Sequence, residues 1–510
     1  MSSFPWLTTL GLLPLVGAVV VALLPASVAD RAKHTALGFS LVTLLFTMAA
    51  ALQFDTGSNA QFQLVEQHSW IRQFGVSYSL GVDGVALILI VMAMVLAPVC
   101  ILAAWHDVPD VGRRQQSYFA LLLSLQTFMV GVFAATDVFL FYAFFEAMLI
   151  PVYFLIGVYG GRHRRRAAIK FLMFSLTGGL IMLVAVIALY LQGPGGERGF
   201  LLSSLTGLAL DPGTARWLFV GFFVAFAVKA PLFPVHTWLP DAASESPPAV
   251  AVLLIGVLDK VGTYGMIRFC LQLFPEASRW ATPVVLTLAV VSVLYGAVAA
   301  IGQRDVMRLV GYTSISHFGF IVLGIFAMTS VGTAGSSLLM LNHGFSTAAL
   351  FLVAAMLVRR RGSSWIPDYG GWQRVTPALA GVFLVAGLSA LALPGLSTFI
   401  SEFLVLVGTF QRYQVAAVVA TLGIILAALY VLLMVQRMLT GPKPEQAGDV
   451  ADLTTREKLV AAPLLAAFLV LGFYPKLALD VIDPSVAKTL SYVGVSDPAP
   501  AHPVAEGAPR

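Results

Sequence analysis

Long apolar runs alternate with short polar breaks along almost the whole chain. Each run reaches about 18 residues or more, enough to cross the hydrocarbon core of a bilayer as a helix. Two runs, 214–243 and 375–409, exceed one straight span and contain internal proline and glycine. The pattern predicts an all-α integral membrane protein with about 14 transmembrane helices. The predicted helices are 3–25, 34–54, 84–105, 116–134, 136–159, 168–192, 214–243, 247–272, 281–302, 308–329, 334–358, 375–409, 414–438 and 457–478.

Composition supports the same class. Of the 510 residues, 59% are hydrophobic and 11% are charged, whereas about 25% are charged in a typical soluble protein. The two cysteines, Cys100 and Cys270, both lie in apolar segments. Iron–sulfur clusters need several thiolates at close spacing, so we expect no redox cofactor and no metal in this chain.

Basic residues are distributed unevenly between the two sides of the predicted membrane. Nineteen Lys and Arg residues fall in or beside the loops after the odd-numbered spans, against eight on the other side. Cytoplasmic loops are the richer in Lys and Arg, so both termini are predicted to be non-cytoplasmic. The run 162–166, with four arginines, is interpreted as a topology anchor. The Ala-, Val-, Gly-, Leu- and Arg-rich composition indicates a bacterial plasma membrane.

Ionisable side chains occur inside the predicted spans. Each costs at least about 2.5–3.5 kcal/mol near the bilayer centre and usually marks an ion route. Residues of this kind, spread along the chain with alternating sign, are typical of a proton relay. They are Glu146, Lys229, Asp259, Lys260, His317, His343 and Glu402.

Some of these residues also allow a structural interpretation. Glu146 and Lys229 would suit an ion pair that ties two helices together, and His317 and His343 would suit hydrogen bonds to neighbouring helices. His236 lies among prolines in a polar break and is a further relay candidate. Arg268, near a helix end, is expected to extend to the membrane interface.

Two of the spans are interrupted close to a charge. The segment VKAPLFPVHTWLP places Pro231 and Pro234 directly after Lys229, and LALPGLSTFISEF places Pro394 before Glu402. Proline removes a backbone donor and clashes with the preceding turn. The freed backbone groups survive at membrane depth only against protein or water.

The interruptions recur at matching places. Helices four to eight (116–272) and nine to thirteen (281–438) each have the interrupted span in fourth position. This is the sequence sign of a repeat-built transporter. An odd number of spans per unit makes the repeats inverted. We expect three N-terminal helices within 1–110, a last helix at 457–478 and a flexible tail at 479–510.

The motifs around these residues resemble the antiporter-like membrane subunits of respiratory complex I, most closely the subunit M branch. Glu402 favours that branch, because the other branches and the related cation/proton antiporters are expected to carry lysine there. The matching stretches are LGVDGVALILI (80–90), FFEAMLIPVYFLIGVYGG (144–161), FAVKAPLFPVHTWLPDA (226–242), GYTSISHFGFIVLGI (311–325), LNHGFSTAALFL (341–352) and LALPGLSTFISEFLVL (391–406).

The resemblance implies a proton-translocating subunit of NADH:quinone oxidoreductase that carries no redox centre of its own. NADH, FMN, iron–sulfur clusters and quinone would bind to other subunits, and the antiporter-like subunits L and N would be partners. Glu146, Lys229, Lys260 and Glu402 match the family's relay positions. Asp259 departs from the family, where an apolar residue is expected before this lysine.

The hypothesis for the mechanism is a proton path from the cytoplasm through Lys229 and Lys260 to Glu402. A nearby carboxylate favours the charged form of a buried lysine and burial disfavours it. Movement of Glu146 would therefore switch Lys229 between holding and releasing a proton, with histidines carrying protons between the lysines. The alternatives are a subunit of a cation/proton antiporter and a subunit of a membrane-bound hydrogenase-type complex.

Overall fold

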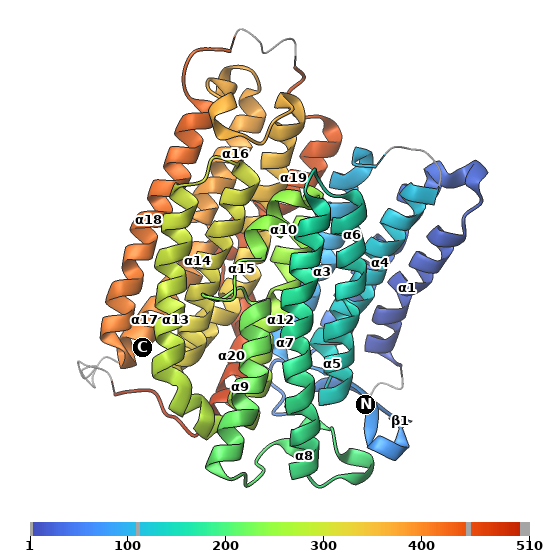
Figure 1. Ribbon diagram of the computed structural model, residues 1–510, viewed down its shortest axis with the longest axis vertical. Coiled ribbons are helices and arrows are strands. Elements are labelled where there is room, and N and C mark those ends of the chain that lie inside the picture. Colours follow the sequence, from blue (N-terminus) through green and yellow to red (C-terminus); the bar gives the residue numbers. More distant parts are fainter. Residues whose placement is uncertain (1–3, 109–112, 445–449, 500–510) are drawn as a thin grey trace.

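The apolar segments fold into a bundle of long helices that run mostly along the longest dimension of the molecule (Figure 1). The structure is a computed structural model that describes residues 4–108, 113–444 and 450–499. Within these residues, 11 helices are long and apolar enough to cross a membrane. The number is 12 if α19 (Thr455–Phe473) and α20 (Lys476–Val493), bent by 69°, form one span. The predicted class, a helical protein with many spans, is confirmed.

The N-terminal part contains a β-hairpin that the all-α prediction missed. Strand β1 (Gln63–Ile71) pairs antiparallel with β2 (Val76–Val82) in the connection before the third long helix. Gly75 allows the tight connection because it adopts a φ of +68°, which glycine does at little cost. The helices of this part are α1 (Trp6–Leu23), the 3₁₀ turn η1 (Ala26–Arg31), α2 (Ala32–Ala51) and α3 (Gly84–Ala103).

The first half of the remaining chain contains three departures from straight helices. The predicted span 136–159 divides into α5 and α6, the span 214–243 divides into α9 and α10, and the span 247–272 contains two π-helical turns, η5 and η6. The helices are α4 (Arg113–Ala134), α5 (Val138–Ala147), α6 (Leu149–Tyr159), α7 (Arg164–Gln192), α8 (Leu202–Leu205), α9 (Pro212–Lys229), α10 (Leu239–Glu245), α11 (Pro248–Leu253), η5 (Leu254–Leu258), α12 (Lys260–Gly265) and η6 (Met266–Leu271).

The second half contains one interrupted span, formed by α16 and α17. Its other long helices are continuous and close to their predicted positions. The helices are α13 (Pro275–Ile301), α14 (Val306–Ala327), α15 (Ser330–Arg361), α16 (Pro377–Ala390), α17 (Ser397–Arg412) and α18 (Gln414–Leu439).

The predicted flexible tail at 479–510 is wrong for residues 479–493, which belong to α20. This helix packs against α3 and α15. Its buried residues include Ile482, Val486 and Leu490, and this four-residue spacing places them on one face. The apolar face is narrow and the segment is otherwise polar, so it lacks the continuous apolar run used to find the spans. Residues 500–510 lie outside the described part of the chain.

Burial separates inner from outer helices. The most apolar windows of Pro248–Leu271, Val306–Ala327 and Ser330–Arg361 are 100%, 94% and 89% buried within the chain. Those of Trp6–Leu23 and Gln414–Leu439 are each only 33% buried, as expected for helices whose apolar side chains face lipid. The inner helices therefore surround the ionisable residues with protein.

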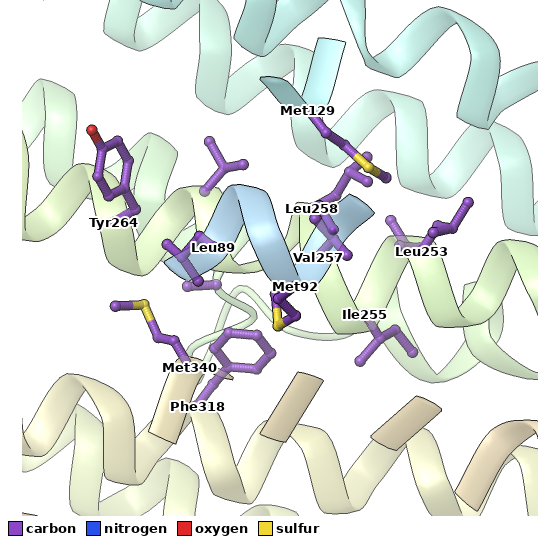
Figure 2. Packing of buried hydrophobic residues seen from close by; sticks show 14 of the residues in the cluster. Leu89, Met92, Met129, Leu253, Ile255, Val257, Leu258, Tyr264, Phe318 and Met340 are labelled. Atoms are coloured by element: carbon purple, nitrogen blue, oxygen red, sulfur yellow. The ribbon is translucent and has the colours of Figure 1, made fainter. Parts of the chain in front are cut away.

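Figure 2 shows part of this apolar interior. Leu89 and Met92 of α3 lie among side chains from the α11–α12 segment, such as Ile255 and Leu258, and from α14 and α15, such as Phe318. These apolar side chains pack closely between the inner helices.

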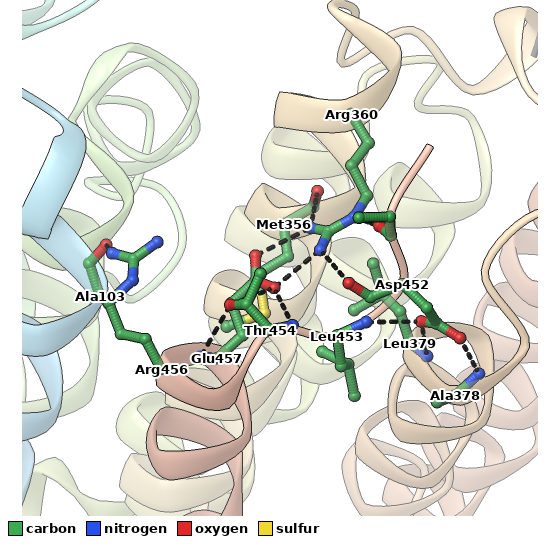
Figure 3. Close-up of polar contacts among 11 residues, drawn as sticks. Ala103, Met356, Arg360, Ala378, Leu379, Asp452, Leu453, Thr454, Arg456 and Glu457 are labelled. Atoms are coloured by element: carbon green, nitrogen blue, oxygen red, sulfur yellow. Dashed lines mark hydrogen bonds and ion pairs between the residues drawn. The ribbon is translucent and has the colours of Figure 1, made fainter. Parts of the chain in front are cut away.

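A polar cluster ties three helices together at one end of the bundle (Figure 3). Arg360, at the C-terminus of α15, donates to both carboxylate oxygens of Glu457 on α19 at 2.8 and 2.7 Å. The carboxylate of Asp452 accepts from the first backbone N–H groups of α16, at Ala378 and Leu379. Charge-assisted bonds are the stronger ones, so this cluster fixes the ends of α15, α16 and α19.

Candidate functional site

The first interruption lies between α9 and α10, as predicted. Helix α9 ends at Lys229, and the prolines that follow prevent its continuation. Trp238 Nε1 donates to the carbonyl of Val228 at 2.9 Å, and the backbone N–H of Phe233 donates to Ser292 Oγ at 2.9 Å. Side chains thus satisfy backbone groups that the missing helical turn leaves free.

The second interruption separates α16 from α17, also as predicted. Ala392 and Gly395 have positive φ angles of 60° and 91°. His317 Nε2 donates to the carbonyl of Ala390 at 3.0 Å, and Asn342 Nδ2 donates to that of Ser397 at 2.6 Å. Polar side chains of α14 and α15 therefore bind the carbonyls exposed at this break.

Glu146 of α5 and Lys229 of α9 are close but not joined. Lys229 is fully buried, and its Nζ has no hydrogen-bond partner in the described part of the chain. It lies 5.0 Å from the ring centroid of Phe145 and 5.7 Å from that of Phe171. The two charges influence each other electrostatically, yet they form no ion pair within the described residues. The structural ion pair considered above is therefore not formed.

The carboxylate of Glu146 lies against Gly179 of α7. A Cβ added at Gly179 would lie 1.6 Å from Glu146 Oε1, and this oxygen has no hydrogen-bond partner among the described residues. The missing side chain of Gly179 therefore provides the space in which the carboxylate lies.

Lys260 is the first residue of α12, one residue after the π-helical turn η5, and is fully buried. Its Nζ donates to the carbonyl of Ile255 at 2.7 Å and lies 2.7 Å from Nδ1 of His343. It also lies 5.1 Å from the ring centroid of Phe318. Lys260 of α12 is therefore in direct contact with a histidine of α15.

His343 connects to the second interruption through His317 of α14. The two ring centroids are 4.9 Å apart. His317 Nδ1 contacts the carbonyl of Thr313 at 2.7 Å, while Nε2 contacts the carbonyl of Ala390 at 3.0 Å and Glu402 Oε1 at 3.3 Å. The ring nitrogens of His317 thus contact two backbone carbonyls and the carboxylate of Glu402.

The structure thus brings four of the predicted residues into one row, which we call the α12–α17 row: Lys260, His343, His317 and Glu402. The row links α12, α15, α14 and α17.

His236 lies apart from the row, in the first interruption. Neither ring nitrogen has a hydrogen-bond partner within the described chain. Its ring centroid lies 5.6 Å from that of Phe233 and 4.8 Å from that of Tyr295. Its place in a relay stays a prediction.

A charged cluster that was not predicted from the sequence lies on the side of the Arg-rich loop 162–166. Asp241 of α10 accepts from Lys170 of α7 at 2.6 Å and from Arg308 of α14 at 2.5 Å. The sequence did contain a signal for this cluster, because the charged residue Asp241 directly follows the proline-rich segment that interrupts the span.

Arg268 does not extend to the interface. It is 2% exposed and forms an ion pair with Asp83, with a further bond to Gln272 Oε1 at 3.2 Å. Asp83 also caps the N-terminus of α3 through the backbone N–H of Ala86. An aspartate directly before an apolar run is a typical cap, and this signal identifies Asp83 but not its partner.

Within residues 4–108, 113–444 and 450–499, no group of three or more His, Cys, Asp or Glu side chains is arranged to hold a metal ion. The two cysteines are buried and unpaired, on α3 and in η6. The groups gathered in the interior are acids, amines and imidazoles.

A bundle of apolar helices with buried acid–base groups beside two interrupted helices defines a class, the ion-translocating membrane proteins. Residues 135–427 match the family described as NADH:quinone oxidoreductase/Mrp antiporter, TM. The chain belongs to this family.

Similar proteins of known name indicate which branch of this family the chain resembles. The chain is 49% identical to the NADH-quinone oxidoreductase subunit M of Mycobacterium tuberculosis (strain ATCC 25618 / H37Rv), over 100% of this chain and 99% of the relative. A chain of the respiratory complex I from Thermus thermophilus is 31% identical, with a TM-score of 0.87, over 96% of this chain and 100% of that one. A chain of the Mrp complex from Dietzia sp. DQ12-45-1b, at 22% identity and a TM-score of 0.83 over 97% and 99%, shares the fold.

Proposed function

We propose that this chain conducts protons across the membrane as a membrane-arm subunit of an NADH:quinone oxidoreductase. The observation that carries the proposal is the α12–α17 row. It joins the central lysine to the acid of the second interruption through two imidazoles, at 2.7 Å from Lys260 to His343 and 3.3 Å from His317 to Glu402. Imidazole accepts and donates protons near neutral pH, so such a row suits proton transfer.

The entry to the row is formed by Glu146 and Lys229. The ammonium of Lys229 has no hydrogen-bond acceptor within the described chain, so it is held by ring faces and by the field of the carboxylate. A carboxylate that approaches stabilises the ammonium, and one that withdraws favours proton release. His236, seven residues further along the broken segment, is proposed to lie on the route from the cytoplasmic side to Lys229.

The energy for this movement comes from elsewhere in the complex. Moving one charge against 100 mV requires about 2.3 kcal/mol, which quinone reduction would supply through neighbouring subunits. We propose that NADH, FMN, iron–sulfur clusters and quinone bind to those subunits, and that antiporter-like subunits L and N pack beside this chain.

The architecture proposed for the membrane has fourteen spans. Within the described residues, 11 helices are long and apolar enough to cross a membrane, or 12 with the bent pair of α19 and α20. These 12 do not include the interrupted pairs α9–α10 and α16–α17. If each interrupted pair forms one more span, the total is fourteen. We propose that 116–272 and 281–438 form inverted repeats and that both termini lie outside the cytoplasm of a bacterial plasma membrane.

The test is proton uptake by inverted membrane vesicles after NADH is added, with native chain, Lys260→Ala and Lys458→Ala. Lys458 is an exposed lysine on α19 and serves as the matched control. We expect uptake to collapse in Lys260→Ala alone, while NADH oxidation by an artificial acceptor persists in all three. Unchanged uptake and quinone reduction in Lys260→Ala would overturn the proposal.

The same vesicles distinguish the antiporter alternative. A cation/proton antiporter would show proton movement that responds to a sodium gradient without NADH. The proposed subunit would show uptake that requires NADH and a quinone.

A further inference from the structure

Asp259 is a buried acid that the proposed path does not use. Its side chain is 0% exposed, and neither carboxylate oxygen has a hydrogen-bond partner in the described part of the chain. It lies at the junction of the π-helical turn η5 and α12, directly before Lys260. A carboxylate buried without hydrogen-bond partners is costly.

The helix points Asp259 and Lys260 in different directions. Adjacent residues project about 100° apart around a helix. Lys260 is directed to His343 of α15, at 2.7 Å. Gly262 packs against the end of α9. A Cβ added at Gly262 would lie 2.5 Å from the carbonyl oxygen of Phe226 and 2.7 Å from the backbone nitrogen of Ala230.

Asp259 shares the α9 side of the helix with Gly262. Residues three apart lie on one face, and the backbone N–H of Gly262 bonds to the carbonyl of Asp259 at 3.2 Å. The part of α9 that Gly262 contacts, between Phe226 and Ala230, contains Lys229 at its end. Asp259 therefore lies directly before Lys260 in the chain and on the side of the helix that faces the end of α9, where its charge interacts with both Lys229 and Lys260.

We propose that Asp259 carries the proton from Lys229 to Lys260. The inference rests on the proposed function and adds a residue to its path. In the first step the Lys229 ammonium gives a proton to the Asp259 carboxylate, leaving a neutral amine and a carboxylic acid. In the second step the acid O–H gives the proton to the free amine of Lys260, restoring the carboxylate and forming the ammonium. No electrons move.

The surroundings of Lys260 fit the second step. A neutral lysine amine has two N–H groups and one lone pair. The carbonyl of Ile255 accepts from one N–H, and the contact with His343 occupies a second position of the nitrogen. The third position of the amine can then accept a proton from another direction. Because Asp259 contacts neither lysine directly, each transfer requires a side-chain rotation or a bridging water.

The test uses the whole complex in inverted vesicles with four chains: native, Asp259→Asn, Asp259→Glu and Lys260→Ala. Asparagine keeps the shape and removes the acid, whereas glutamate keeps the acid. Proton uptake is divided by NADH oxidation with an artificial acceptor, which corrects for the amount of assembled complex. We expect uptake to fall at least about fivefold in Asp259→Asn and to keep more than about half its native rate in Asp259→Glu.

A second readout separates proton transfer from packing. If the missing acid makes this step limiting, uptake by Asp259→Asn slows more in D₂O than native uptake does. A double variant, Lys229→Met with Asp259→Asn, is expected to be no slower than the slower single variant, because the two residues act in series.

Native uptake in Asp259→Asn together with collapse in Lys260→Ala overturns this inference and leaves the proposed function standing. Equal losses in Asp259→Asn and Asp259→Glu, with a native isotope effect, overturn it in favour of a packing role. Native uptake in Lys260→Ala overturns the proposed function itself.

Discussion

The two interrupted helices hold their charges in different ways. At the first interruption, Lys229, Glu146 and Asp259 have side-chain atoms without hydrogen-bond partners within the described chain. We call these three residues the open half. At the second, Glu402 pairs with His317, which contacts two backbone carbonyls. We call the α12–α17 row the connected half, because Lys260 contacts His343 and His317 contacts Glu402, although His343 Nε2 has no hydrogen-bond partner within the described chain.

The difference indicates which half changes during turnover. Unpaired buried charges cost free energy, and a site keeps them where a partner must arrive and leave. The contacts from Lys260 to His343 and from His317 to Glu402 hold the geometry of the other half, where the two imidazole rings lie 4.9 Å apart. We infer that the open half sets the timing of proton entry and that the connected half conducts.

The largest expected effect is loss of the first lysine. Lys229→Met keeps the length of the side chain and removes the charge, so proton uptake should fall by about tenfold or more. Because no hydrogen bond is lost, the amount of subunit in the membrane should stay native. Uptake assays and immunoblots of vesicles, with Lys458→Met as the control, measure both. Native uptake would show that the open half is not on the path.

A second substitution tests the connected half. Glu402→Gln should lower proton uptake by about tenfold and also remove the carboxylate that His317 Nε2 contacts at 3.3 Å. Removing one partner of a buried pair costs about 3 kcal/mol or more, so the complex should inactivate at lower temperature. Heat inactivation of the purified complex measures this. Native heat resistance would contradict the ion pair and the distinction between the halves.

A smaller effect is expected at Gly179. In Gly179→Ala the new Cβ would collide with Glu146 Oε1, at 1.6 Å, so the carboxylate must move relative to Lys229. Uptake should fall by about two- to fivefold, a loss of less than about 1.4 kcal/mol in effective free energy. Gly38→Ala, whose Cβ would meet nothing within 4 Å, is the control. Equal uptake in both variants would mean that the carboxylate position is unimportant.

The smallest effect concerns the backbone of the first interruption. Trp238→Phe removes the bond from Nε1 to the carbonyl of Val228 and should lower the free energy of unfolding by about 1 kcal/mol. Proton uptake should change little. Thermal denaturation of the purified complex, compared with Trp217→Phe, measures the loss, because Trp217 is 78% exposed. An equal response of the two variants would argue against a role for this bond in closing the break.

The positions of the long helices and of their two interruptions could be predicted from the sequence. Pro231 and Pro234 mark one interruption and Pro394 and Gly395 the other, since proline and glycine act through the local backbone. The hairpin β1–β2 and helix α20 were missed because each is stabilised by packing against other parts of the chain.

The candidate site was only partly predictable. A charge in an apolar run is visible in the sequence, so Lys229, Lys260 and Glu402 were found. The side chains with which these residues interact could not be predicted from the sequence. Asp83 and Arg268 are 185 residues apart in the chain and form a buried ion pair, while Glu146 and Lys229, which suit a pair by charge, do not form one.

The sequence by itself therefore determined the class of protein, the places where its spans break and the identity of its buried acids and bases. These depend on the hydropathy of segments and on local backbone chemistry. Only the tertiary structure decided which of those groups touch, that Lys260 contacts His343 and Asp259 faces α9. Contacts between helices depend on rotation and depth in the bundle, and these are fixed by packing over the whole chain.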